Sequence, residues 1–558
     1  MKQKILYTIL ALAACGGLMG CSDDPIVDNP SGETVIYWLR VTNAGLTGTE
    51  TVEGVVNEQA KTVTFDVPAE TNIEEIKFRS KLSLNAQLDK ESYDFSNLEA
   101  PVTVVNVENT STYTVKFNLV ATSERPIMER VGVRLPDGTE HDGYVSMVDS
   151  TIYLGAEGFD EVVLTEVVSL PHRANKIYSN IENNVVKRDP KGSVKLEFMG
   201  KTQEYRFSFS AIPVFGADFN KATVWNYSAD GGNQSPDWVS DNTRSADYDG
   251  KEMLVVSREG GVNPYVLTVD AIKSGNPSGR TLNMDGVSSG TFLLSAGRLA
   301  QGHIYICNLS VGIKESEPFK IYHWSNSSAP CETVFTLDGT GDTEADKTFA
   351  AKRFGDNMSV DIDENGNGYM FFVTQDGTMI MRLDVTGFTT ISNPTYVAPP
   401  TAASYYASVN RVVGTTNEYV YTSSQAPIIL MDKDGKQIGN TIPAEVVPAR
   451  CCDARVIVYD NERYLIATAS RWGSWVKNEQ IPTLYVYSLA DGINTAQAFD
   501  KLIEAEDKSP LFELEMGGSY GSAPAANTGW GIVNGNLSVM GAATRAGYVL
   551  VEFPEREE

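Results

Sequence analysis

The chain has 558 residues, of which 45 are basic and 72 acidic, so its formal net charge is −27 at pH 7. A field this negative repels nucleic acid and anionic lipid, which argues against a phosphate-backbone partner and leaves neutral ligands open. The length corresponds to three or four ordinary domains or to one large repeat fold, and a hydrophobic content of 42% can fill a core.

Residues 1–20 predict a secretory signal peptide that is removed on export. Two early lysines precede an apolar run over residues 5–14, which is too short to span a bilayer. Residues 18–21, Leu-Met-Gly-Cys, match the bacterial lipobox, whose small residues give the lipoprotein peptidase access to the bond before a lipidated cysteine. Cys21 is therefore the predicted lipidation site, and an ordinary signal peptide with a chance cysteine is the alternative.

Residues 21–34 predict a flexible tether, because they are acidic, contain proline and show no hydrophobic periodicity. Ser22, Asp23 and Asp24 resemble the acidic export signal of Bacteroidota-type surface lipoproteins. Lipid chains anchor a protein without crossing the bilayer, and no later stretch reaches the roughly 20 apolar residues of a spanning helix. The predicted location is the outer membrane, with the protein anchored by lipid and facing the cell exterior.

Residues 35–122 alternate between apolar and polar side chains, which is typical of strands with one buried face. Val63 and Phe65 share one face of such a strand, and Tyr113 and Val115 share one face of another. Turn-forming segments separate the strands. The pattern predicts an antiparallel β-sandwich of bacterial immunoglobulin-like type.

Residues 125–556 repeat a pair of short apolar strands joined by a polar turn. The second strands of the clearest pairs lie at 264–270, 318–324, 378–384, 427–432, 483–492 and 547–553. A period of roughly 50 to 60 residues is typical of a β-propeller. Segments 161–171 and 204–213 are further candidate blade strands and bring the expected number of blades to about seven, within a range of six to eight. Residues 496–506 have helical spacing and predict a helix inserted between late blades.

Two segments, 353–372 and 518–541, resemble an uncharacterised Bacteroidota surface lipoprotein family of the polysaccharide-utilisation type. Proteins of this family pair an immunoglobulin-like N-terminal domain with a propeller-like C-terminal domain. The resemblance implies an all-β fold, a surface location and a glycan-related neighbourhood. It supplies no catalytic motif.

Asp361, Asp363 and Asn365 stand at alternate positions before a glycine, as the oxygen ligands of a Ca²⁺ loop do. Tyr369 and Phe372 occupy the later positions where such a loop needs a carboxylate. The alternative interpretation is a hairpin, which we favour because Asn-Gly between apolar strands is a strong hairpin signal. Ca²⁺ at these three residues is the one candidate cofactor.

Aromatic residues in polar loops are the candidate ligand-binding residues, because aromatic rings stack on sugars while nearby acids accept hydroxyl hydrogen bonds. The alternative is packing between blades. The candidates are Trp238, Tyr405, Tyr406, Trp472 and Trp475.

No catalytic residue is predicted, because no nucleophile elbow, phosphate-binding loop or zinc-protease motif is present. The four histidines fit structural roles better than metal ligation. Cys307, Cys331, Cys451 and Cys452 are expected to be buried thiols, with a bridge from Cys307 to Cys331 and a vicinal pair as alternatives.

Together these features predict a lipid-anchored, non-catalytic binding protein whose ligand is a carbohydrate. Two alternatives stay open. The protein could be an interaction scaffold with outer-membrane protein partners, or a propeller enzyme that acts on polysaccharide as a hydrolase or lyase.

Overall fold

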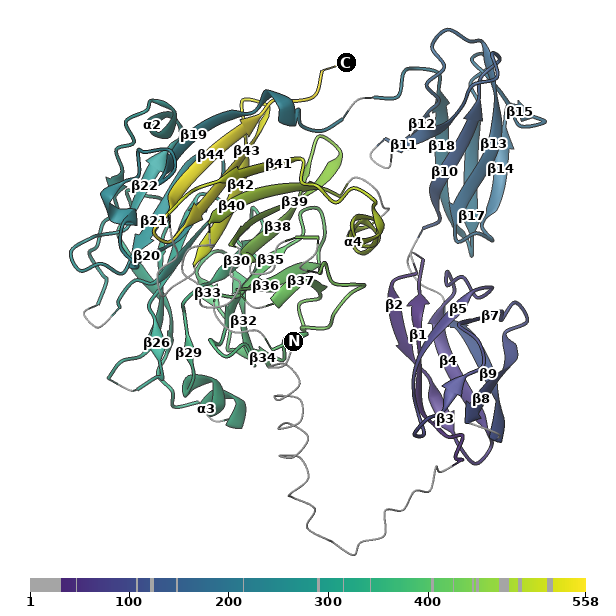
Figure 1. Ribbon diagram of the computed structural model, residues 1–558, viewed down its shortest axis with the longest axis horizontal. Helices are drawn as coiled ribbons and strands as arrows, with labels where there is room; N and C mark the ends of the chain where they lie inside the picture. The colour runs from purple at the N-terminus through teal and green to yellow at the C-terminus, as the bar shows by residue number, and fades with distance from the viewer. Residues whose placement is uncertain are drawn as a thin grey trace, which may run out of the picture. The chain divides into compact units, whose positions relative to one another are not determined.

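The computed structural model describes residues 32–557, apart from 47, 107–108, 121–124, 147–148, 214, 289–291, 315, 342, 403–405, 425, 444–445, 448–450, 471–480, 490–493 and 519–524. The described residues are mainly strands, as the all-β prediction requires, with three α-helices (Figure 1). These helices are α2 (Val269–Lys273), α3 (Glu344–Ala350) and α4 (Thr495–Glu504). None of the described helices is long and apolar enough to cross a membrane. Cys21 lies outside the described residues.

The N-terminal unit consists of two sheets around one core. One sheet has the order β2 (Glu50–Glu53), β1 (Ile36–Ala44), β5 (Ile76–Leu82) and β7 (Ser92–Tyr93). The other has the order β3 (Val55–Asn57), β4 (Thr62–Pro68), β9 (Asn109–Val120), β8 (Glu99–Asn106) and β6 (Gln87–Leu88). Leu39 of the first sheet and Phe65 and Val115 of the second are fully buried in the shared core. The predicted alternation of buried and exposed positions is confirmed for β4 and β9.

Residues 127–208 form a nine-stranded, nearly closed, barrel-like sheet. Its order is β14 (Asn175–Ser179), β17 (Ser193–Phe198), β18 (Lys201–Ser208), β12 (Thr151–Tyr153), β11 (Glu140–Ser146), β10 (Ile127–Arg134), β13 (Glu161–Leu170), β16 (Val185–Lys187) and β15 (Ile181–Glu182). The segments 161–171 and 204–213, interpreted above as blade strands, belong to this sheet as β13 and β18. That interpretation was wrong because both strands pair only with strands of residues 127–208 in the described structure.

The described residues from Thr223 to Phe553 form six sheets of three to five strands, besides a small ladder of β26 (Ser310–Val311) and β29 (Arg353–Phe354). Four of the six are β20 (Thr243–Tyr248), β21 (Glu252–Ser257), β22 (Tyr265–Thr268) and β23 (Arg280–Thr281); β24 (Ala296–Ala300), β25 (His303–Cys307), β27 (Phe319–Trp324) and β28 (Glu332–Leu337); β30 (Ser359–Ile362), β31 (Gly368–Val373), β32 (Ile380–Thr386), β33 (Thr390–Ile391) and β34 (Thr395–Val397); and β35 (Ser408–Arg411), β36 (Tyr419–Ser423) and β37 (Ala426–Met431). The other two are β38 (Cys451–Tyr459), β39 (Glu462–Ser470), β40 (Pro482–Ser488) and β41 (Phe512–Glu515), and β42 (Ala526–Val533), β43 (Asn536–Ala543), β44 (Gly547–Phe553) and β19 (Thr223–Ser228).

The six sheets follow one another in a closed ring, as in a β-propeller. Their first strands, β20, β24, β30, β35, β38 and β42, contact one another in that order, and β42 contacts β20 again. We call these the inner strands. β19, from the start of the region, pairs with β44 at its end, which Figure 1 shows as teal beside yellow. The six strand pairs predicted from the sequence are the second and third strands of these sheets, so the propeller-like architecture is confirmed.

The predicted helix at 496–506 is confirmed as α4. It begins at Asn494, whose side chain accepts a hydrogen bond from the backbone N–H of Gln497 and so caps the helix. Phe499 on its buried face packs into a core shared with strands β37 to β40.

Candidate functional site

Charged side chains from three inner strands fill the middle of the ring. Asp247 comes from β20, Arg298 from β24, and Asp453 and Arg455 from β38. Arg455 Nη2 lies 2.6 Å from Asp247 Oδ1, and Arg298 Nη2 lies 3.7 Å from Asp453 Oδ2. Burial opposes the charge of Arg455, but Asp247 and Asp453 outweigh it and raise the pKa of this arginine. A buried arginine, Arg298, and a partly buried one, Arg455, therefore face two buried aspartates.

Asparagines complete the hydrogen bonds of these charges. Arg298 Nη2 donates to Asn357 Oδ1 at 2.8 Å and Arg298 Nη1 to Asn527 Oδ1 at 3.3 Å. Asn410 Nδ2 donates to Asp453 Oδ1 at 2.6 Å. We call this charge-balanced set the channel plug. Its ion pairs and hydrogen bonds join residues from all sides of the ring across the channel.

A cavity of about 590 Å³ opens where the inner strands end. Residues from the later half of all six inner strands line it, so these strands lead toward the same mouth. Each contributes to the lining, for example through Tyr248, Ala300, Ile362, Arg411, Val456 and Ile532. Arg455 of the plug forms part of the floor.

Asp361, the third of the four residues of β30, is an acidic residue in the lining of this cavity, which also includes Asp249 and Lys251. Its Oδ1 lies 3.0 Å from Arg411 Nε, and the hydroxyl of Tyr419 donates to its Oδ2 at 3.5 Å. The carboxyl is only 12% exposed, and burial raises its pKa to about 6 although Arg411 acts in the opposite direction. Asp361 can therefore gain or lose a proton close to neutral pH.

Trp530 of β42 supplies a partly exposed aromatic ring to the same cavity, beside the exposed Ile532. Close packing explains why glycines stand on both sides of Trp530, since a side chain at either position would clash with a neighbouring strand. A Cβ on Gly531 would lie 2.3 Å from Gly250 Cα, and one on Gly529 would lie 2.6 Å from Tyr248 Cβ. These close contacts hold this end of β42 against the neighbouring sheet and so fix the position of the ring.

Of the predicted aromatic residues, Trp238 is not available to a ligand. Its side chain is fully buried at the end of the short 3-10 helix Pro236–Trp238, with its ring 6.3 Å from that of Tyr548. The prediction was wrong because this large ring fills the core between two neighbouring sheets. Tyr406 is 7% exposed and lies just before β35. Tyr405, Trp472 and Trp475 lie outside the described residues.

Asp361, Asp363 and Asn365 do not converge on one point. Asp361 is paired within β30 and lines the cavity, whereas Asp363 lies in the hairpin between β30 and β31 and accepts hydrogen bonds from the backbone N–H groups of Asn365 and Asn367. The hairpin interpretation is therefore correct. Within the described residues, no group of three or more His, Cys, Asp and Glu side chains is arranged to hold a metal ion.

Cys307 and Cys331 are free thiols, so the alternative of a bridge between them is wrong. Burial raises the pKa of Cys307 to about 12, which makes this thiol unreactive. His303 Nδ1 lies 2.7 Å from His323 Nε2, and His323 Nδ1 lies 2.7 Å from Glu332 Oε1. This chain of contacts between neighbouring strands is a structural role.

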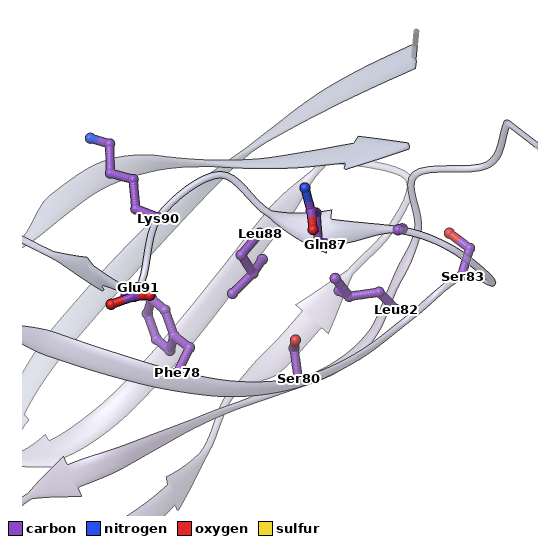
Figure 2. A pocket seen from close by; sticks show the side chains of 9 residues that line it. Phe78, Ser80, Leu82, Ser83, Gln87, Leu88, Lys90 and Glu91 are labelled. Carbon is purple, nitrogen blue, oxygen red and sulfur yellow. The ribbon is translucent and has the colours of Figure 1, made fainter. Parts of the chain in front are cut away.

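A smaller hollow of about 380 Å³ lies in the N-terminal unit, between β5 and β6 (Figure 2). Leu82 and Leu88 point into it, and Lys90 points away. It gathers neither an aromatic platform on an open rim nor convergent charges, so the cavity of the ring is the stronger candidate site.

The sequence did not single out Arg298, Asp453, Arg455 or Trp530. They lie on inner strands, which mix polar with apolar residues and so lack the continuous apolar runs that identified their neighbours. The inner strands could have been found by their position in the sequence, since each of them directly precedes a predicted strand pair.

Comparison with solved structures gives a full-length likeness. The crystal structure of a DUF4623 family protein from Bacteroides eggerthii is 25% identical, covers 94% of this chain and 99% of that chain, and has a TM-score of 0.55. An α-L-arabinofuranosidase from Clostridium thermocellum is 12% identical, with 45% of this chain and 91% of that chain covered and a TM-score of 0.30. An endo-arabinase from Bacteroides thetaiotaomicron is 12% identical, with coverage of 57% and 96% and a TM-score of 0.29. The last two scores are too low to support an argument.

The search of curated proteins found no match. A family model, described as a domain of unknown function, matches residues 23–122 and 193–556. The part that it leaves out, 123–192, holds most of the nine-stranded sheet. Because the model matches most of the chain and the Bacteroides protein matches it nearly end to end, this chain belongs to the DUF4623 family.

Proposed function

We propose that this protein is a carbohydrate-binding lipoprotein of the outer surface, anchored through Cys21, and that it binds glycan without cleaving it. The six sheets are the blades of a six-bladed propeller, and the N-terminal unit is an immunoglobulin-like spacer. The protein is attached to the membrane through its lipid alone.

The cavity at the ends of the inner strands is the observation that carries this proposal. Trp530 offers a ring on which the apolar face of a pyranose can stack, and Asp361, Arg411 and Asn410 offer hydrogen bonds to hydroxyl groups in the same space. A concave site with a partly exposed aromatic ring and several polar groups suits a neutral sugar better than an apolar ligand.

The test measures retention of the chain from residue 32 onward on affinity gels that contain plant, host or microbial polysaccharides. We expect retention by at least one of them. Trp530→Ala should weaken that binding at least about tenfold, which corresponds to about 1.4 kcal/mol. Trp225→Ala, which removes a partly buried ring from the outermost strand β19, is the matched control and should bind normally. Retention by no glycan, or unchanged binding by Trp530→Ala, would contradict the proposal.

Cleavage of polysaccharide, as a hydrolase or a lyase, is the second candidate function. The raised pKa of Asp361 favours it, since a carboxyl that titrates near pH 6 can act as a general acid. Its test is the release of reducing or unsaturated ends from any retained polysaccharide. Release that disappears in Asp361→Asn would make the protein an enzyme. Binding without release would leave the binding function.

A further inference from the structure

Three arginines meet at the opposite end of the channel, where the inner strands begin. Arg244 is the second residue of β20, and Arg258 directly follows β21, whose end pairs with the start of β20. Arg353 lies in β29, six residues before β30. The sheet topology therefore brings the three guanidinium groups to one place on the far side of the plug.

Asp356 forms ion pairs with two of these arginines, Arg258 and Arg353. Arg353 forms a two-pronged pair with it, Nε to Oδ2 at 2.7 Å and Nη2 to Oδ1 at 2.6 Å, and Arg258 Nη2 lies 3.1 Å from the same Oδ1. Arg258 also donates to Ser295 Oγ at 2.6 Å, and its side chain is only 3% exposed. Arg258 and Arg353 therefore share the carboxylate of Asp356.

Arg244 has neutral partners. Its Nη1 donates to Tyr406 Oη at 2.8 Å and its Nε to the backbone carbonyl of Asp241. No carboxylate of the described residues lies within ion-pair distance of Arg244. Burial raises the pKa of Tyr406, so its hydroxyl keeps its proton at neutral pH, and the described residues offer that proton no acceptor.

The two charged clusters of the channel differ in their balance. In the plug, Arg298 and Arg455 face Asp247 and Asp453. In the arginine cluster, which we define as Arg244, Arg258, Arg353, Asp356 and Tyr406, three guanidinium groups meet one carboxylate. Burial, together with the charge of Arg244, lowers the pKa of Arg258 although Asp356 opposes this. This local excess of positive charge exists in a chain of net charge −27.

We propose that the arginine cluster is a second ligand site that takes the carboxylate of an acidic sugar, a uronic acid. The guanidinium of Arg244 and the hydroxyl of Tyr406 donate to the carboxylate, while Asp356 holds Arg258 and Arg353 behind them. A planar guanidinium fork fits a carboxylate in two hydrogen bonds. That the ligand carries a carboxylate follows from the arginine cluster itself. That this carboxylate belongs to a sugar rests on the proposed function.

The test titrates the chain from residue 32 onward with galacturonate and glucuronate, with galactose and glucose as neutral counterparts and with acetate as the bare carboxylate. We expect each uronate to bind at least tenfold more tightly than its neutral counterpart. Arg244→Ala should remove this preference, and Tyr406→Phe, which keeps the ring and deletes only the hydroxyl, should weaken it severalfold. Arg280→Ala, which removes an arginine that is 52% exposed, is the matched control and should keep it.

The two proposals fail separately. Trp530→Ala should weaken retention by a neutral glycan at least about tenfold and leave uronate binding intact. Arg244→Ala should remove the preference for uronates and leave retention by the neutral glycan intact. Uronates that bind no better than neutral sugars, or a preference that survives in a folded Arg244→Ala, would overturn the second site. Binding of acetate that depends on Arg244, without binding of any uronate, would contradict the assignment of a sugar ligand. It would support only a site for a carboxylate.

Discussion

Single residues of the channel show how burial sets the behaviour of a charge. In the plug, each charge lies opposite a charge of the other sign. At Asp361 the balance is different, because burial outweighs the attraction of Arg411 and favours the protonated acid. Aspartate is thus an ion-pair partner of arginine in one layer of the ring and a carboxyl with a raised pKa in the next.

Asp361 should make the folded state less stable as the pH rises. Its pKa is 3.8 in an unfolded chain and about 6 in the folded one, so the folded state holds the proton more tightly between these values. Its contribution is fully favourable below about pH 4 and is lost as the pH rises through 6. Asp361→Asn stays neutral, so the variant should gain up to about 3 kcal/mol over the natural protein between pH 4 and pH 7.5.

Denaturant unfolding at both pH values measures this gain, and Asp376→Asn provides a control of opposite sign. Although burial opposes it, hydrogen bonds from Lys352, Thr374 and Thr378 hold the pKa of Asp376 well below its usual range. Its stabilising contribution is therefore lost as the pH falls. A constant difference between Asp361→Asn and the natural protein at all pH values would contradict the assignment.

Removing one charge from the plug should be costly. Asp453→Ala leaves Arg298 and Arg455 with only Asp247, and an uncompensated buried charge costs about 3–5 kcal/mol. Asp384→Ala removes a carboxylate that is 54% exposed and 3.5 Å from its arginine, which should cost at most about 1 kcal/mol. Equal unfolding free energies for the two variants would show that the plug contributes little to stability.

At the scale of elements, the sequence predicts the middle of each sheet and misses its inner edge. The strands β21 and β22 are continuous apolar runs, since both of their faces are covered by neighbouring sheets, and such runs are easily recognised. The inner strands β24 and β30, with sequences AGRLA and SVDI, are short and mix polar with apolar residues, because part of each strand faces the channel. The site lies on these strands, so the fold was more predictable than the site.

The strand β19 closes the ring, so its side chains should matter more than its place near the start of the region suggests. Tyr227 is buried against Tyr548, with ring centroids 5.1 Å apart, and donates to the carbonyl of Ile272. Tyr227→Ala should lower the free energy of unfolding by about 3–5 kcal/mol. Val224→Ala, at a 40% exposed position of the same strand, should change it by less than about 0.5 kcal/mol. Similar small losses in both would mean that the ring does not depend on this strand.

At the scale of the whole molecule, strand patterns alone could not separate the nine-stranded sheet from the ring. Strands β13 and β18 have the same apolar alternation as blade strands, and only their partners differ. β12 pairs in parallel with β18, about fifty residues later in the sequence, a long-range pairing that no local pattern encodes. The expected seventh blade came from this ambiguity.

The N-terminal unit has a core of its own, from Ile36 to Phe117, that shares no residue with the cores of the rest of the chain. We therefore expect two unfolding transitions in calorimetry of residues 32–557, and a fragment of residues 32–121 that melts like one of them. Phe65→Ala removes a buried ring that stacks on Phe117 at 5.1 Å, so it should shift that transition alone by lowering the stability of the unit by about 3–5 kcal/mol. Tyr227→Ala should shift only the other transition. A single transition that both variants move would mean that the two units unfold together, and the N-terminal unit could not then act as an independent spacer.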